Sequence, residues 1–359
     1  MSKIKNDNHK FPYKWELKTA NFTKDKGKVF SCFACGGGST MGYKLAGFDV
    51  LGCNEIDPKM MEAYVKNHKP KYSYLEPIQQ FKLRADLPKE LYNLDILDGS
   101  PPCSSFSMAG NREKDWGKGK VFREGQAMQV LDTLFFDFID LGKKLQPKVI
   151  IAENVKGLLL GNAKSYVIRI YKAFDDAGYY CQHFLLDASK MGVPQKRERV
   201  FFIALRKDIA TPFLKQVDMF TVLPKINMVF NEKPILYKEI RRDDGNKCAF
   251  NIPDSCRSLW RLTNPGDSLS SAHDKGSFFN EYKVSRQAVV NTIRAKRAPF
   301  DSDEERYLYN DELIECGSFP IDYNFLSQKL VYIIGMSVPP VMVAKIATRV
   351  YEYWLSKLT

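Results

Sequence analysis

The feature that most constrains the fold is an alternation of short apolar runs with segments whose apolar residues recur at helical spacing. The apolar runs are KVFSCFA, GFDVLGCNEID, NLDILDGSPP and KVIIAENV, and each has the length of a buried strand. Between them lie STMGYKLAG, PKMMEAYVKNH and GQAMQVLDTLFFDFIDLGKKL, which are expected to be helices. The last segment places on one face Met128, Leu131, Leu134, Phe135, Phe138 and Leu141. This alternation predicts the α/β class, with a doubly wound, mostly parallel sheet.

The same patterns divide the chain. Residues 1–26 are polar and lysine-rich and are expected to be a loosely held, flexible leader. Residues 27–206 form the sheet domain, closed by YYCQHFLLDASKMG and RERVFFIALR, which are expected to pair antiparallel. Residues 207–305 break into polar loops, which indicates a smaller, irregular domain. Residues 306–359 return to the sheet domain and end in a helix with one apolar face: Val341, Ala344, Ala347, Val350, Tyr351 and Trp354.

Composition limits the setting of the protein. The chain has no uninterrupted apolar run of about 18 residues and its start lacks the apolar stretch of a signal peptide, so we expect a cytoplasmic location and no membrane. Eight scattered cysteines suit a reducing compartment. Cys32 and Cys35 form a CxxC, but no further ligands stand at a recognised spacing, so we expect no metal. The net charge of +12 suits a phosphate-binding surface without requiring one.

A glycine cluster points to a nucleotide-like cofactor. Gly36, Gly37 and Gly38 follow the first strand and precede a helix, so backbone can approach a ligand closely there. The second strand ends at Glu55, about twenty residues later, where a carboxylate can accept hydrogen bonds from ribose hydroxyls. The pattern fits NAD, FAD or S-adenosylmethionine, or a purely structural turn. The absence of a clean GxGxxG argues against NAD.

Two further strand ends carry reactive side chains. Pro101 and Pro102 fix the backbone before Cys103, a rigid mount for a nucleophile, although a proline-bounded loop with an incidental thiol reads the same way. The next strand ends at Glu153 and Asn154, which would place an acid beside the thiol if the two strands are neighbours. The alternative for that pair is an ordinary helix cap.

A pair of arginines precedes another strand. In QKRER, strand alternation would place Arg197 and Arg199 on one face, where they could hold a phosphate or an anionic intermediate. The alternative is a solvated, charged strand start.

Taken in order, these motifs resemble the DNA cytosine-C5 methyltransferase family, from Phe30 to the final helix. FSCFACGGG resembles the cofactor motif of the family, NEID its ribose-binding motif, GSPPC its nucleophile motif, ENV its glutamate motif and QKRER its arginine motif. RYLYNDELIECGSFPIDYNF and GMSVPP resemble the last two. One such motif is weak, whereas seven in order are specific.

The resemblance implies a Rossmann-like fold that binds S-adenosylmethionine and transfers its methyl group to C5 of a flipped-out cytosine, leaving S-adenosylhomocysteine. It implies that Cys103 adds to C6, that Glu153 neutralises the ring at N3, and that Arg197 and Arg199 fix O2 and help to lower the thiol pKa. The cofactor contacts that it implies are Phe30, Gly36, Gly37, Gly38, Glu55, Ile56, Ile78, Pro102 and Ser337.

The family also implies double-stranded DNA as the partner, bound by a monomer in restriction-modification or orphan methylation, with a paired restriction endonuclease left open. Residues 207–305 correspond to a target-recognition domain, to which VNTI at 290–293 would be the return segment. Residues from Ser104 to Arg123 would form a mobile loop over the cytosine. Most side chains of the recognition region are expected to be solvated or core, and the residues expected near DNA are Ser104, Arg241, Arg242, Arg257, Arg261 and Lys275.

Some positions depart from the family pattern. Cys32 or Ala34 stands where a glycine is usual, Pro77 replaces a common aspartate, and Met336 replaces an asparagine. Three rival interpretations remain: a tRNA cytosine-5 methyltransferase, a catalytically silent DNA-binding regulator, and a nicotinamide oxidoreductase.

Overall fold

The structure of the chain is a computed structural model. It describes residues 9–102, 119–120, 129–130, 133–160, 163–219, 221–244, 252–273, 277–278 and 280–358. These residues fall into two compact units. The first, which we call the sheet unit, contains residues 22–186, 198–229 and 346–359. The second, the loop unit, contains residues 1–21, 187–197 and 230–345.

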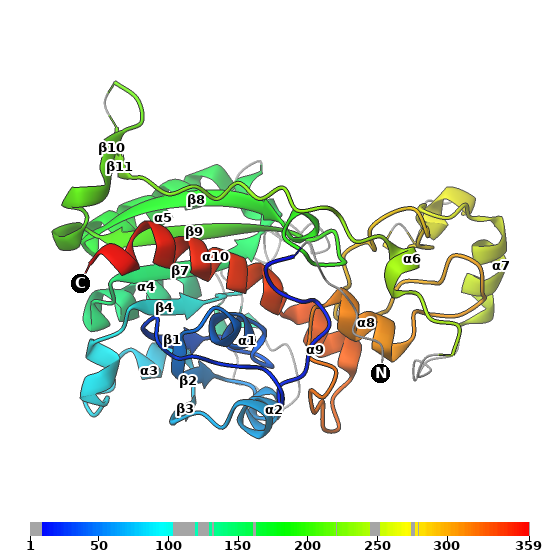
Figure 1. The fold of residues 1–359 in the computed structure, drawn as a ribbon, viewed down its shortest axis with the longest axis horizontal. Helices are drawn as coiled ribbons and strands as arrows, with labels where there is room; N and C mark the ends of the chain where they lie inside the picture. The colour runs from blue at the N-terminus through cyan, green and yellow to red at the C-terminus, as the bar shows by residue number, and fades with distance from the viewer. Residues whose placement is uncertain are drawn as a thin grey trace. The chain divides into compact units, whose positions relative to one another are not determined.

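The sheet unit is built on a seven-stranded sheet in the order β3-β2-β1-β4-β7-β9-β8 (Figure 1). Its strands are β1 Lys28–Cys32, β2 Asp49–Glu55, β3 Tyr72–Leu75, β4 Ile96–Gly99, β7 Val149–Val155, β8 Tyr179–Asp187 and β9 Glu198–Arg206. The first five pair in parallel, and β9 pairs antiparallel with β7. The predicted mostly parallel, doubly wound sheet is confirmed, with β9 and β8 at its end.

Helices follow the strands as the periodicity predicts. They are α1 Gly38–Leu45, α2 Pro58–His68, α3 Ile78–Phe81, α4 Leu134–Leu145 and α5 Lys164–Asp176. The start of α2 is set by local chemistry, because the Asp57 side chain accepts from the amides of Lys59 and Met60 and Pro58 occupies the first turn.

The helix expected from 125 to 145 is only partly correct. α4 begins at Leu134, and strand β6 (Gln129–Val130) pairs with β5 (Gly119–Lys120) where helix was predicted. Met128 and Leu131 lie outside the described residues. The predicted helix was too long at its N-terminal end, because the pairing of β6 with β5 overrides the local helical periodicity there.

The core of the sheet unit fills one side of these helices. Phe135 and Phe138 of α4 are almost completely buried, and the Phe135 ring packs edge-on against Phe174 of α5 and Phe202 of β9. Phe30 of β1 is fully buried and stacks on Phe81. These packed rings stabilise the central strands of the sheet. A functional site is expected at the carboxyl ends of these strands.

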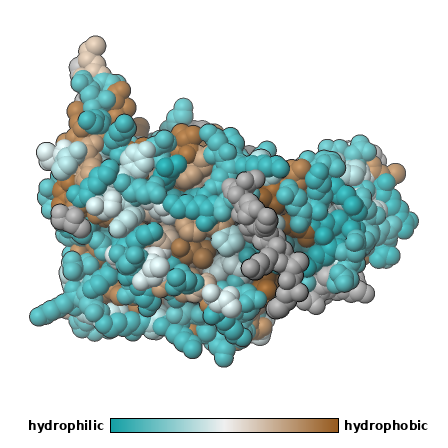
Figure 2. All heavy atoms as spheres, in the orientation of Figure 1, coloured by the Kyte–Doolittle hydropathy of each residue, from teal (hydrophilic) through white to brown (hydrophobic). Residues whose placement is uncertain are grey.

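Residues 207–229 belong to the sheet unit and not to the irregular domain in which we placed them. They contain the hairpin of β10 (Leu214–Gln216) and β11 (Val222–Pro224). Hydrophobic side chains at and beside this hairpin are exposed, notably Val217 and Met219. The face in Figure 2 is otherwise mostly hydrophilic, with apolar atoms in small patches.

The loop unit has little regular structure. Its helices are α6 Tyr237–Ile240, α7 Asp254–Leu262, α8 Asn310–Cys316 and α9 Leu330–Met336. Single 3-10 turns in the two units are η1 Lys89–Tyr92, η3 Lys156–Leu159, η5 Ala188–Lys190, η6 Lys207–Ile209, η7 Thr211–Phe213, η8 Leu269–Ala272 and η9 Leu355–Lys357.

Buried charges hold the loop unit together. The carboxylate of Asp301, which is fully buried, accepts hydrogen bonds from the Tyr237 hydroxyl at 2.5 Å and from Arg241 Nε at 3.1 Å. Arg306 lies 2.9 Å from the same carboxylate and 2.9 Å from Glu312. In the loop unit, buried ion pairs connect the segments of the chain, whereas in the sheet unit hydrogen bonds between strands do so.

The N-terminal segment is also tied into the loop unit. Trp15 is mostly buried and donates its indole N–H to the carbonyl of Ser318 at 2.9 Å, while the amide of Leu17 donates to Asp322. The expectation of a loosely held leader is therefore wrong for the described residues from His9 onward. An isolated tryptophan in a polar stretch was the available signal.

The final helix α10 (Pro340–Tyr353) is apolar on the predicted face, where Val341, Ala344, Ala347 and Val350 are fully buried. Residues Leu330–Lys357 have the length and hydropathy of a membrane span, but 83% of that window is buried inside the protein. Burial of this degree is typical of a core helix, so the span is weak evidence for a membrane.

Candidate active site

The carboxyl ends of β4 and β7 bring two predicted motifs together. The strands pair in parallel with Gly99 opposite Ala152, so Glu153 follows at the edge of the sheet. Asn154 donates from Nδ2 to the carbonyl of Pro101 at 3.1 Å and accepts from the amide of Val155. The expected adjacency of the two strands is confirmed. Cys103, two residues past Pro101, lies outside the described residues, as does Ser104.

Glu153 is paired with one of the predicted arginines. Arg199 Nε lies 2.9 Å from Glu153 Oε1, and both side chains are largely buried. The antiparallel pairing of β7 and β9 allows this contact. Arg199 lies opposite Val155, and Glu153 is two residues before Val155, on the same face of the strand. Burial lowers the pKa of Arg199, an effect that the Glu153 carboxylate opposes. The ion pair orients the acid at the strand edge.

Arg197 does not share this arrangement. It precedes β9, lies in the loop unit and is 2% exposed, so strand alternation does not apply to it. Its guanidinium donates to the carbonyls of Ile293 and Gly335, at 3.2 and 3.0 Å. The prediction of a common face is therefore wrong. Arg197 instead anchors the VNTI segment within the loop unit.

The glycine cluster forms a tight turn into α1. Gly37 is the N-cap residue with a φ of 84°, and a Cβ at this position would lie 2.2 Å from Nε2 of His68. Glycine is therefore required both by the backbone and by the side chain beneath it. His68 is buried, and this burial lowers its pKa to about 3, so the ring supports the turn as a neutral group.

Glu55 joins this turn to the end of β2. Its Oε2 accepts from the amide of Cys35 at 2.7 Å, and its Oε1 accepts from the amides of Ile56 and Asp57 at 2.8 and 2.9 Å. Burial raises the pKa of Glu55, and the three amides oppose that rise. Because a carboxylate offers about four acceptor positions, one remains for a ribose hydroxyl.

The other predicted cofactor residues differ in exposure. Phe30 is a core residue, whereas Phe33, just past the end of β1, is half-buried with a φ of 54° and packs on Phe138. Ile78 is also in the core, at 2% exposed. The sequence signal for Phe33 was its position beyond the strand. The remaining residues are Ile56 and Pro102, both half-buried, and Ser337, which caps α9 in the loop unit.

Asp98 is a buried acid that the sequence analysis missed. It is 4% exposed and accepts from Ser31 Oγ at 2.6 Å and from the Tyr43 hydroxyl at 3.0 Å. Burial raises the pKa of Asp98 to about 7, and the Glu153 carboxylate adds to that rise. The available signal was an acid inside the otherwise apolar strand ILDG.

The arginines predicted to meet DNA fall into two groups. The Arg241 side chain is 7% exposed and lies within the ion-pair network around Asp301, so the expectation that it contacts DNA is not supported. Arg242 pairs with Glu315. Arg257 and Arg261 both pair with Glu305 on the surface, with side chains 43% and 63% exposed. Lys275 lies outside the described residues.

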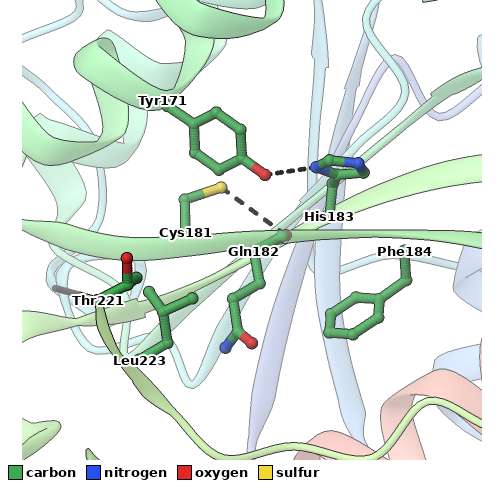
Figure 3. Close-up of a pocket in the computed structure, with 7 residues that line it drawn as sticks. All are labelled: Tyr171, Cys181, Gln182, His183, Phe184, Thr221 and Leu223. Carbon is green, nitrogen blue, oxygen red and sulfur yellow. Dashed lines mark hydrogen bonds between the residues drawn. The ribbon is translucent and has the colours of Figure 1, made fainter. Parts of the chain in front are cut away.

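A pocket of about 400 Å³ lies elsewhere in the sheet unit, between α5, β8 and the β10–β11 hairpin (Figure 3). The Tyr171 hydroxyl is hydrogen-bonded to His183 Nδ1, and Gln182 donates to the carbonyl of Pro224. None of the predicted site residues lines this pocket. Across the described ranges, no three His, Cys, Asp or Glu side chains are grouped as a metal site.

Several curated proteins are similar to this chain in sequence. Type II methyltransferase M.FnuDI of Fusobacterium nucleatum is 38% identical over 183 residues, 51% of this chain and 48% of that protein. M.NgoPII of Neisseria gonorrhoeae is 32% identical over 253 residues, 70% and 65% of the two chains. The matches thus span about half and about two thirds of these relatives. M1.HphI of Haemophilus parahaemolyticus is 28% identical over 343 residues, 89% and 85% of the two.

Solved structures agree on the fold. A DNA modification methyltransferase encoded within an E. coli prophage superposes with a TM-score of 0.67 at 19% identity, covering 91% of this chain and 99% of that one. The Dnmt2 methyltransferase of S. pombe gives 0.58 at 14% identity, covering 90% and 98%. The profile of C-5 cytosine-specific DNA methylases matches residues 27–352. Because this profile spans most of the length of the chain, the chain belongs to the C-5 cytosine-specific DNA methylase family.

Proposed function

We propose that this protein transfers a methyl group from S-adenosylmethionine to C5 of a flipped-out cytosine in duplex DNA. The observation that carries the proposal is the junction of β4 and β7. There, Asn154 ties the Pro101-Pro102 turn to the strand that presents Glu153, and Arg199 holds the acid. A thiol mounted two residues beyond Pro101 and an oriented acid are the two groups that a covalent attack on a pyrimidine requires.

In the mechanism we propose, the Cys103 thiolate adds to C6 of the cytosine, which makes C5 nucleophilic. Glu153 neutralises the negative charge that develops on the ring by sharing a proton with N3. Arg199 keeps that carboxyl in place and supplies positive charge beside it. S-adenosylmethionine, when bound, supplies the electrophilic methyl group. Loss of the C5 proton and release of the thiolate then restore the enzyme.

The turn at the end of β1 fits this cofactor. Gly36, Gly37 and Gly38 give close backbone approach, and Glu55 retains an acceptor position for ribose hydroxyls. We assign the aromatic contact to Phe33 rather than to Phe30, because no part of the Phe30 ring is exposed. The remaining contacts that we propose are Ile56, Pro102 and Ser337.

For the partner, we propose that duplex DNA is bound through the excess positive charge of the chain, with Arg257 and Arg261 as exposed candidates in the loop unit. The relatives are named Type II methyltransferases, so a restriction-modification role, with or without a paired endonuclease, is the setting we propose. The protein would act as a monomer in the cytoplasm, where bacterial DNA lies.

Bisulfite sequencing of duplex DNA after incubation with the purified protein and S-adenosylmethionine tests the proposal. We expect protected cytosines at one recurring sequence, and none with a Cys103→Ser variant. With S-adenosylmethionine present, duplex oligonucleotides that carry 5-fluorocytosine at that sequence should become covalently attached to the wild-type protein. The fluorine at C5 cannot be removed by a base as the proton is, so the thiolate is not released from C6. Methylation of transfer RNA with unmodified DNA in the same assay would overturn the assignment of the substrate.

A further inference from the structure

Asp98 lies at the point where the direction of the sheet order reverses. β1 and β4 are neighbours in the sheet. On one side of this pair β2 and then β3 follow β1, and on the other side β7 follows β4. In doubly wound sheets, ligands bind in the crevice above the carboxyl ends of these two strands. Asp98 is the penultimate residue of β4 and pairs directly with Ser31 of β1. Its carboxyl group therefore lies in the floor of the crevice where the cofactor is expected.

The contacts of Asp98 connect it to the cofactor turn. Ser31 Oγ donates to Oδ2 at 2.6 Å, and the Tyr43 hydroxyl of α1 donates to Oδ1 at 3.0 Å. The hydroxyl of Ser39, in the first turn of α1, also acts to lower the pKa of this carboxyl group. Ser31 and Ser39 flank Gly36–Gly38 in sequence, whereas Tyr43 is a fully buried residue of α1, so the acid connects the end of β1 to the helix that follows the glycine turn.

The strongest influences of the described residues on this carboxyl group come from neutral or acidic groups. The described groups that act most strongly on it are the three hydroxyls and the Glu153 carboxylate of β7, none of which is a cation. The other titratable groups that sense it are Cys32 of β1, Tyr43 of α1 and Tyr64 of α2, all neutral when protonated. A buried carboxyl without a cation is unfavourable in its ionised form. Burial accordingly raises its pKa to about 7.

We propose that Asp98 is the countercharge for the sulfonium of the methyl donor, so that the site distinguishes the cationic donor from its neutral thioether product. The inference rests on the proposed function, because that function supplies the cationic ligand. The donor and the product differ by one methyl group and one positive charge on sulfur. A buried anion in the floor of the crevice would favour the donor and promote release of the product after transfer.

The sign of the pH dependence follows from this charge. In the free protein, Asp98 takes up a proton as the pH falls through about 7. A bound cation favours the ionised form, so affinity for S-adenosylmethionine should rise with pH across this range and binding should release a proton. Affinity for S-adenosylhomocysteine should not rise in the same way. The two ligands share their amino and carboxyl groups, so the ratio of their dissociation constants cancels those contributions.

The experiment is calorimetric titration of the whole protein with each of the two ligands, at pH 6 and pH 8. For the wild type, we expect the preference for S-adenosylmethionine to grow on the order of tenfold between the two pH values, the change that one unit of pKa represents. In Asp98→Asn, which keeps the shape of the side chain, the preference should be small and independent of pH. Tyr43→Phe removes one donor from the ionised carboxyl, so the rise should move to higher pH; this variant also serves if Asp98→Asn does not fold.

Glu153→Gln separates the contributions of Asp98 and Glu153: because the Glu153 carboxylate adds to the raised pKa of Asp98, this variant should keep the pH-dependent preference and move it to lower pH. The inference is overturned if Glu153→Gln abolishes the pH-dependent preference while Asp98→Asn retains it, or if the wild type binds both ligands with a ratio that does not change with pH. Failure of the proposed function looks different. If the protein does not use this methyl donor, the wild type binds neither ligand at any pH; if only the DNA substrate is wrong, both ligands still bind and the bisulfite assay shows no protected cytosine.

Discussion

The two compact units hold their polar side chains in opposite ways. In the sheet unit, the strand ladders fix the backbone, and the acids at the strand ends have local partners: Glu55 accepts from three amides, Glu153 pairs with Arg199, and the described hydrogen-bond donors to Asp98 are hydroxyls. In the loop unit, charged groups themselves replace the ladders, as Arg241 and Arg306 show around Asp301. A charge in the sheet unit is therefore a candidate for chemistry, whereas a charge in the loop unit is first a candidate for structure.

The largest expected effect tests whether reactive side chains at the strand ends of the sheet unit carry the chemistry. Cys103→Ser should reduce methyl transfer by about a thousandfold or more, because a hydroxyl is a far weaker nucleophile than a thiolate. Binding of S-adenosylmethionine should be unchanged, since the cofactor turn follows β1. Transfer of tritium from labelled S-adenosylmethionine to duplex DNA measures the first quantity and calorimetry the second. Turnover at the wild-type rate would remove Cys103 from the mechanism.

The loop-unit half is tested at Asp301. Asp301→Ala leaves Arg241 and Arg306 buried without their shared carboxylate, which should cost about 3 kcal/mol of stability. Hydrogen exchange should report faster exchange at amides of α8 and of residues 299–309, with β1, β4 and β7 unaffected.

The control for that prediction is Arg286→Gln. Its partner Asp303 and Arg286 itself are about half exposed, so the loss should be under about 1 kcal/mol. Equal effects of the two substitutions would show that buried charge does not hold the loop unit together.

Glu153→Gln comes next in size. A positioned acid contributes on the order of a hundredfold, and the amide retains the shape but cannot neutralise the ring by sharing a proton. Single-turnover methyl transfer on duplex DNA measures the loss. Glu198→Gln is the matched control: Glu198 is the residue before Arg199, pairs with Lys156 in a partly exposed ion pair, and should leave the rate within about twofold. A Glu153→Gln rate equally close to the wild type would contradict the role assigned to the acid.

These two units also differ in how far the sequence could predict them. Strand and helix periods predicted the mostly parallel sheet, and the strand ends predicted Glu153 and the glycine turn, because local pattern and tertiary position coincide there. The order of the strands was not predicted, because it depends on pairing between segments distant in sequence. Asp98 was missed because its importance depends on pairing with Ser31, a contact distant in sequence. Arg197 and Arg241 were misassigned for the same reason: their partners are carbonyls and carboxylates that no spacing reveals.

The smallest expected effect concerns the exposed arginines of the loop unit. Arg261 is 63% exposed and shares Glu305 with Arg257. If Arg261 contacts a phosphate, Arg261→Ala should weaken DNA binding a few-fold and lower the salt dependence of binding by about one ion. Lys172→Ala, which removes a similarly exposed and ion-paired charge from α5 of the sheet unit, is the control and should change neither quantity.

Glu305→Gln gives the same test in the opposite direction. It removes the carboxylate that competes with DNA for Arg257 and Arg261, so binding should tighten by a similar factor. Fluorescence anisotropy of a labelled duplex across a range of salt concentrations measures all three variants. If Arg261→Ala behaves like Lys172→Ala and Glu305→Gln does not tighten binding, then even the exposed arginines of the loop unit are structural, and DNA must be bound by other cations.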